Sequence, residues 1–105
     1  MPATSAAEDL LAFQMKSVGI EFTRQYRFAP PRRWTADFML DGGVLIEVEG
    51  GAWSGGHKRG HAADTDYEKF NEATLAGWTV LRFSTAMVDA GIALATIERA
   101  RVPAC

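Results

Sequence analysis

Apolar and polar residues alternate most clearly in the middle of the chain, where two short segments predict a β-hairpin. Residues 34–40 and 44–49 are mainly apolar, and Asp41-Gly42-Gly43 between them has the composition of a tight turn. Successive side chains of a strand point to opposite faces. One face of the second segment therefore carries Leu45, Glu47 and Glu49, and the other carries Val44, Ile46 and Val48.

Two further elements are predicted before the hairpin. Ser5 followed by Glu8 has the pattern of a capping box at a helix start, and Gly19 marks the helix end. The apolar stripe of this helix is formed by Leu11, Met15 and Val18. A strand follows at about Phe22–Phe28, and its alternation places Phe22, Tyr26 and Phe28 on one face before Pro30-Pro31 end it.

After a Gly-rich segment, the pattern predicts a helix, a strand and a last helix. The first helix covers about Asp64–Ala76, stops at Gly77 and has Tyr67, Phe70, Asn71 and Thr74 at helical spacing. The strand covers Trp78–Phe83 and the last helix about Asp89–Arg101. The connection before Trp78 is long enough for a crossover between parallel strands, so we expect a mixed sheet in the order αβββαβα.

Length and composition indicate one domain over residues 1–105. The chain is 48% hydrophobic, which suffices for a single core, and its net charge of −2 gives no global nucleic-acid signature. Its one cysteine, Cys105, allows no disulfide framework or cysteine-based zinc site. No apolar run approaches membrane-spanning length and no signal-peptide pattern is present, so we expect a cytoplasmic protein that does not bind membranes.

The hairpin gathers carboxylates, because its turn can bring Asp37 beside Glu47 and Glu49. Three carboxylates in a half-buried cluster repel one another, and a hard divalent cation such as Mg²⁺ relieves that repulsion. Acidic residues are otherwise depleted in strands. The sequence thus favours a metal site, with a solvated sheet face as the alternative.

Basic residues flank the acidic strand on both sides. Before it stand Arg24, Arg27, Arg32 and Arg33, and after it stand His57, Lys58, Arg59 and His61. A phosphate-binding rim around an acidic centre has this distribution, and so does an ordinary solvated surface.

Three motifs, in this order and spacing, resemble a known nuclease family over nearly the whole chain. They are Asp37-Phe38, Ile46-Glu47-Val48-Glu49-Gly50-Gly51 and Gly77-Trp78-Thr79-Val80-Leu81-Arg82-Phe83. The element order is similar to the core of the PD-(D/E)XK nucleases, and the motifs are similar to the small branch around the very-short-patch-repair endonuclease and its bacterial and phage relatives. The resemblance implies a restriction-endonuclease-like α/β fold with a mixed sheet flanked by helices.

The resemblance also implies roles for individual residues. Asp37 would be the central metal ligand, and the strand segment Glu47–Glu49 would supply the further ligands, including the carbonyl of Val48, with Glu47 as the main one and Glu49 helping to hold the metal. The lysine usual in the family falls at Glu49 here, so the group that activates water must come from elsewhere. Lys69 on the following helix and His57 after the strand are the two candidates. Lys69 could instead pair with Asp66 or Glu68, and His57 could contact phosphate.

Two more residues have competing interpretations. Glu8 could complete the metal site, as a first-helix acid does in these nucleases, or serve only in the capping box. Trp53 stands where the repair branch carries base-wedging aromatic residues, but a core or rim tryptophan is the simpler interpretation. Arg32, Arg33, Lys58 and Arg59 are the remaining candidates for DNA contacts.

These observations predict an Mg²⁺-dependent endodeoxyribonuclease, with Mn²⁺ able to substitute, that hydrolyses phosphodiester bonds. A chain of this size leaves no room for a separate recognition domain, so we expect structure-selective or weakly sequence-selective cleavage in bacterial or phage DNA processing. A branched substrate would favour a homodimer. The alternative is an inactive nuclease-fold module that binds DNA or protein, which the replacement of the strand lysine by Glu49 would fit.

Overall fold

A four-stranded mixed sheet lies at the centre of the computed structural model, which describes residues 5–49 and 61–101 and, for residues 61–63, the backbone alone. The strands are β1 Thr23–Arg27, β2 Thr35–Leu40, β3 Val44–Glu49 and β4 Thr79–Ser84. They are ordered β1-β2-β3-β4, the first three antiparallel and β4 parallel to β3. The predicted hairpin and mixed sheet are confirmed.

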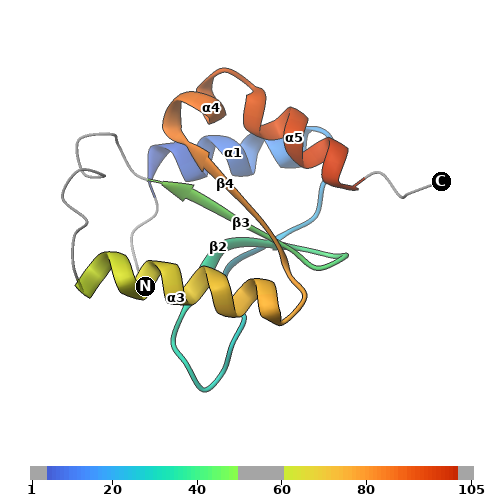
Figure 1. Ribbon diagram of the computed structural model, residues 1–105. Coiled ribbons are helices and arrows are strands. Elements are labelled where there is room, and N and C mark those ends of the chain that lie inside the picture. The colour runs from blue at the N-terminus through green and yellow to red at the C-terminus, as the bar shows by residue number, and fades with distance from the viewer. Residues whose placement is uncertain (1–4, 50–60, 102–105) are drawn as a thin grey trace.

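Helices cover both faces of the sheet (Figure 1). The helices are α1 Ala6–Ser17, α3 His61–Leu75, α4 Thr85–Asp89 and α5 Ile92–Arg101. α1, α4 and α5 pack on one face, and α3 connects β3 to β4 across the other (Figure 1). The α/β class with flanking helices is therefore as the sequence predicts.

Each face of the sheet has its own apolar core. The larger core lies under α1, α4 and α5, and its most enclosed side chains include Leu11, Met15, Phe38, Ile46 and Ile97. The smaller core lies under α3 and contains Phe28, Ala36, Leu45 and Ala73. Full burial of one such large side chain contributes about 1.5 to 3 kcal/mol to folding. The smaller core is therefore the weaker of the two.

The predicted last helix is present as α5, which begins at Ile92 rather than at about Asp89, but the short helix α4 before it was not predicted. Ser84 caps α4 by accepting a hydrogen bond from the Met87 N–H. α4 ends at Asp89, and Gly91, with a φ of 80°, turns the chain before α5 begins at Ile92. A left-handed φ is cheap for glycine, so the helical pattern continues through a break that periodicity alone does not reveal.

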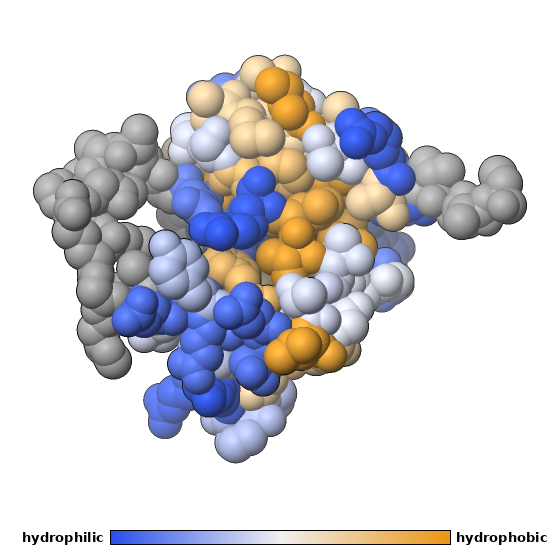
Figure 2. All heavy atoms as spheres, viewed as in Figure 1, coloured by the Kyte–Doolittle hydropathy of each residue, from blue (hydrophilic) through white to orange (hydrophobic). Residues whose placement is uncertain are grey.

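The helix faces also differ in part from the prediction. Ser5 caps α1 as expected, and Leu11 and Met15 are buried, but Val18 follows the helix and is 48% exposed. On α3, Tyr67 is 64% exposed and Asn71 and Thr74 are exposed, while Ala73 is buried. Figure 2 shows hydrophilic residues over much of α3. The inner face of α3 turns out to be partly polar because it lies over a charged part of the sheet.

The predicted common face of Phe22, Tyr26 and Phe28 is wrong. Phe22 packs in the α1-side core, whereas Tyr26 and Phe28 pack in the α3-side core. Between them Gln25 has a φ of 52°, in the left-handed region that side-chain-bearing residues rarely adopt. This residue breaks the alternation, so even-numbered side chains change faces along β1.

Among residues 5–49 and 61–101, the structure contains no helix with the length and apolar character needed to cross a membrane.

Candidate active site

Asp37 and Glu47 face each other where the β2–β3 ladder ends. The paired positions run from Leu40↔Val44 to Phe38↔Ile46, so the next position outward sets Asp37 opposite Glu47. Here side chains take the place of main-chain partners. The Asp37 N–H donates to Glu47 Oε2 at 3.1 Å, and the Val48 N–H donates to Asp37 Oδ2 at 2.7 Å. These two bonds fix both carboxylates against the opposite strand.

Lys69 reaches this pair from α3. Its Nζ donates to Glu47 Oε1 at 3.3 Å, and the two side chains are 15% and 16% exposed. The alternative pairing of Lys69 with Asp66 or Glu68 is thus not needed to explain its position. A half-buried lysine that faces a sheet carboxylate also explains why the inner side of α3 is polar.

The charge balance at Glu47 is unfavourable for an ionised carboxylate. Burial raises the pKa of Glu47 to about 7 from an ordinary value of 4.5. Lys69 opposes this rise in pKa, whereas the negative charge of Asp37 adds to it. One lysine therefore does not fully compensate the buried negative charge.

Glu8 approaches Asp37 from the first turn of α1, and only 8% of the residue is exposed. Its backbone N–H donates to Ser5 Oγ, as the capping prediction requires. Its carboxylate accepts a hydrogen bond from Gln25 Nε2 at 3.3 Å and lies 3.8 Å from Arg24 Nη2. Burial and then the charge of Asp37 raise the pKa of Glu8, while Arg24 lowers it. Asp37 thus acts electrostatically on both Glu8 and Glu47.

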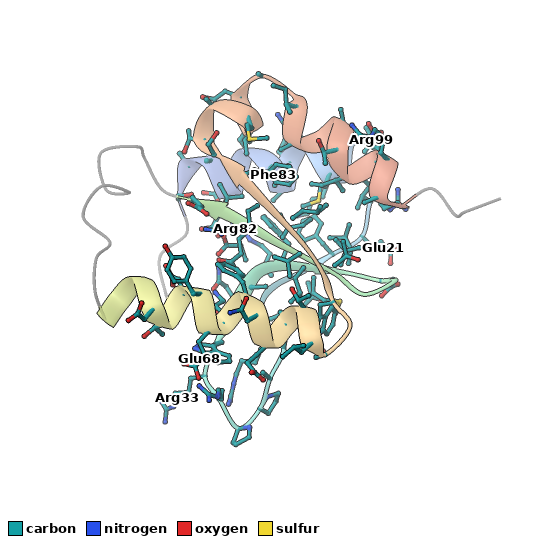
Figure 3. The ribbon with its side chains drawn as sticks, in the orientation of Figure 1. Glu21, Arg33, Glu68, Arg82, Phe83 and Arg99 are labelled. Atoms are coloured by element: carbon teal, nitrogen blue, oxygen red, sulfur yellow. The ribbon has the colours of Figure 1, made fainter. Side chains whose placement is uncertain are left out.

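Glu49 does not join the Asp37–Glu47 pair as the sequence suggested. It is exposed, and its carboxylate pairs with Arg82 on β4, which Figure 3 labels. The Arg82 guanidinium also stacks over the ring of Phe70 on α3, 4.3 Å from the ring centroid. The neighbouring strand supplies this arginine because β4 runs parallel to β3, and it draws Glu49 away.

The potential metal ligands around Asp37 are carboxylate oxygen atoms, which are the ligand type that Mg²⁺ prefers. Within the described side chains, no three or more His, Cys, Asp or Glu residues form a group ready to hold a metal ion. A divalent cation would nevertheless offset the negative charge of Asp37, which adds to burial in raising the pKa values of Glu8 and Glu47. The role of the Val48 carbonyl stays a prediction.

The other predicted site residues divide into two groups. His57, Trp53, Lys58 and Arg59 lie outside the described residues. Arg32 and Arg33 lie in the segment between β1 and β2, both exposed. Arg32 stacks on Trp34, 4.3 Å from the ring centroid, and pairs with Glu68 on α3 at 3.0 Å. Figure 3 shows Arg33 at the periphery of the molecule.

Sequence reasoning missed the part that Gln25 plays in this site. Its side chain contacts Glu8 and also accepts a hydrogen bond from Thr35 Oγ1 at 3.5 Å. Neither the left-handed φ of Gln25 nor its approach to α1 has a signal in the sequence, because glutamine is not a residue that favours such a backbone.

The fold has a counterpart among solved structures. The chain superposes on the homing endonuclease I-Bth0305I catalytic domain with a TM-score of 0.69, covering 91% of this chain and 92% of that one at 17% sequence identity. This similarity establishes a nuclease-like fold. No protein-family model matches the chain, and no curated protein matches it at a significant level.

Proposed function

We propose that this chain is an Mg²⁺-dependent endodeoxyribonuclease that hydrolyses phosphodiester bonds in DNA. One observation carries the proposal: the half-buried carboxylates of Asp37 and Glu47 are fixed against each other's strands, Lys69 contacts Glu47, and the buried Glu8 interacts electrostatically with Asp37. Three carboxylates gathered from separate elements, with Lys69 and Arg24 as nearby cations, are costly to the fold. Such a cost is understandable where a metal ion and a phosphate are to be bound.

Each residue has a chemical task in this proposal. Asp37 and Glu47 would hold the metal ion, with Glu8 and the Val48 carbonyl completing its shell, and Mn²⁺ would substitute for Mg²⁺. The ion supplies charge to stabilise phosphate oxygens and lowers the pKa of water. Lys69, held by Glu47, would orient the attacking water, and His57 is the alternative for that role.

Two similarities of unequal weight bear on which substrate we propose. The similar solved structure is titled a homing endonuclease catalytic domain, so DNA is the natural candidate, but 17% identity transfers no specificity. The motifs resemble the very-short-patch-repair branch of the PD-(D/E)XK nucleases. Structure-selective or weakly sequence-selective cleavage is part of this proposal, and a homodimer would cut both strands of a branched substrate.

The test is incubation of the purified protein with supercoiled plasmid, single-stranded DNA and a four-way junction, each with Mg²⁺, Mn²⁺ or EDTA. Asp37→Asn is the matched control, because the amide oxygen can still accept the Val48 N–H while the charge is lost. We expect metal-dependent cleavage of at least one substrate and a loss of about 100-fold or more in Asp37→Asn. Cleavage that persists in EDTA or in Asp37→Asn would overturn the proposal.

A second candidate is an inactive nuclease-fold module that binds DNA or protein. The observation in its favour is Glu49, which stands where the family carries lysine and is neutralised by Arg82. Thermal melting with added Mg²⁺ or Mn²⁺ separates the two candidates. A metal site raises the melting temperature as metal is added, whereas a binding-only module shows little change.

A further inference from the structure

Gln25 is an outlier of the backbone in the middle of a strand. Its φ of 52° lies in the left-handed region, although β1 continues on both sides of it and pairs with β2. Glycine would adopt this φ without strain, and asparagine would tolerate it better than glutamine. A longer side chain at such a position suggests that the side chain itself is used.

The position of Gln25 in the register brings it to the candidate site. Arg24 pairs with Phe38 and Tyr26 with Ala36, so Gln25 stands opposite Asp37. Its amide joins two elements: Nε2 donates to Glu8 Oε1 at 3.3 Å, and Oε1 accepts from Thr35 Oγ1 at 3.5 Å. The bond to Thr35 orients the amide so that its N–H₂ group faces the carboxylate.

A neutral donor has an advantage over a cation at this place. Arg24 also lies near Glu8, but its Nη2 is 3.0 Å from Asp9 and 3.8 Å from Glu8, so its closer pairing is with Asp9. A close cation would compensate the charge of Glu8 and lower its attraction for a metal ion. An amide fixes one carboxylate oxygen through a hydrogen bond and leaves the negative charge in place.

We propose that Gln25 is a positioning residue that orients the Glu8 carboxylate toward Asp37 for a divalent cation, in the way that hydrogen-bond partners orient metal ligands. This inference rests on the proposed function and adds to it a residue outside the motifs. The left-handed backbone places the glutamine amide between α1 and β2, and the break in the alternation of β1 is its structural consequence.

The test measures Mn²⁺ binding calorimetrically without DNA, in the full chain and in Gln25→Gly and Gln25→Asn. Glycine removes the side chain and relaxes the backbone, whereas asparagine tolerates the φ but is one methylene too short to reach Glu8. We expect both variants to bind Mn²⁺ about five- to tenfold more weakly, with melting temperatures in EDTA unchanged or higher. Unchanged Mn²⁺ affinity in both folded variants would overturn the proposal.

A double-mutant comparison separates positioning from a general structural role. If Gln25 acts through Glu8, adding Gln25→Gly to Glu8→Gln should weaken Mn²⁺ binding no further. Additive losses would instead show that Gln25 acts on the fold. Wild-type protein that binds no Mn²⁺ would overturn the proposed function and this inference together, whereas wild-type binding with no effect of Gln25 would overturn this inference alone.

Discussion

The two ends of the β2–β3 hairpin use the same pair of strands in different ways. At the turn end, Leu40 pairs with Val44 and Met39 with Leu45, and all except the half-buried Met39 are buried. At the other end, hereafter the open end, Asp37 and Glu47 face each other and hydrogen-bond to main-chain N–H groups of the opposite strand. The turn end is held by apolar burial and the open end by carboxylates.

This difference separates the stability of the sheet from its chemistry. The turn end gains free energy from every apolar group that it buries. The open end buries charge: burial, together with the nearby charge of Asp37, raises the pKa of Glu47 although Lys69 opposes the rise. Uncompensated negative charge favours the binding of a cation but adds little to the stability of the fold. Substitutions at the turn end should therefore lower stability, whereas substitutions at the open end should lower activity.

Leu45 and Glu47 offer the largest contrast, because they lie on the same face of β3, two residues apart. Leu45 is 1% exposed in the α3-side core, so Leu45→Ala should lower the free energy of unfolding by about 4 kcal/mol through lost burial and a cavity. Glu47→Gln should not lower it at pH 7.5, and in metal-free buffer it should raise it, since the substitution removes an uncompensated buried charge. Urea denaturation measures both.

Cleavage rates should show the reverse order. Below its melting temperature Leu45→Ala should cut DNA within about threefold of wild type, whereas Glu47→Gln should lose about 100-fold or more. A Glu47→Gln variant with full activity, or one that loses as much stability as Leu45→Ala, would remove the distinction between the two ends.

Much of the turn end could be predicted from sequence because it depends on local patterns. The alternation in residues 44–49 defines the two faces of β3, and the Asp41-Gly42-Gly43 turn uses glycines with φ values of 94° and 83° that suit a tight connection. The turn and the strand register alone are enough to predict that Asp37 lies opposite Glu47. Both signals lie within about a dozen residues of each other.

The open end was less predictable because its partners come from distant elements. Lys69 was a candidate, but its choice of Glu47 over neighbours on its own helix depends on how α3 packs. Glu49 was expected beside Asp37, yet Arg82 from the parallel strand β4 binds it. The left-handed Gln25 has no compositional signature at all. Tertiary contacts and backbone strain depend on how all the elements pack together, so they cannot be predicted from the pattern of a single segment.

The pH dependence of stability gives the next largest effect. The folded-state pKa of Glu47 is about 7 against an ordinary 4.5, so folding favours the protonated form. Its contribution is complete below pH 4.5 and is lost as the pH rises through 7. The metal-free protein should therefore lose roughly 3 kcal/mol of unfolding free energy between pH 4.5 and 8, measured by urea denaturation in EDTA.

Glu47→Gln is the control for this pH effect and should flatten most of the decline. Saturating Mg²⁺ should also reduce it, because a cation binds the deprotonated carboxylate and stabilises the folded protein at high pH. An equally steep decline in Glu47→Gln would assign the effect to other groups, of which Glu8 is the first candidate because its pKa is also raised.

Lys69 tests whether the cation at the open end serves the reaction. Lys69→Met should lower turnover about 30-fold, equivalent to roughly 2 kcal/mol of transition-state stabilisation, with little loss of DNA affinity. Lys16→Met is a matched control, since Lys16 is an exposed lysine on α1. If Lys69→Met is mild and His57→Ala is severe in single-turnover assays, water activation belongs to His57.

The smallest effect concerns the surface beyond the open end, where an acidic protein must meet a polyanion. Arg33 is exposed and lies on the α3 side of the molecule, whereas Arg99 lies on α5 across the sheet (Figure 3). If DNA approaches the α3 side, Arg33→Ala should flatten the slope of log affinity against log salt by about one unit, equally for all DNA sequences, because phosphate contacts carry no sequence information. Arg99→Ala should leave the slope unchanged.

Arg32→Ala should have an intermediate effect, since Arg32 is already engaged by Glu68 and Trp34. Fluorescence anisotropy in Ca²⁺, which supports binding without turnover in many magnesium nucleases, measures all three. A change of slope in Arg99→Ala but not in Arg33→Ala would show that DNA binds the α5 side of the sheet. The hairpin carboxylates would then not be the site of DNA contact.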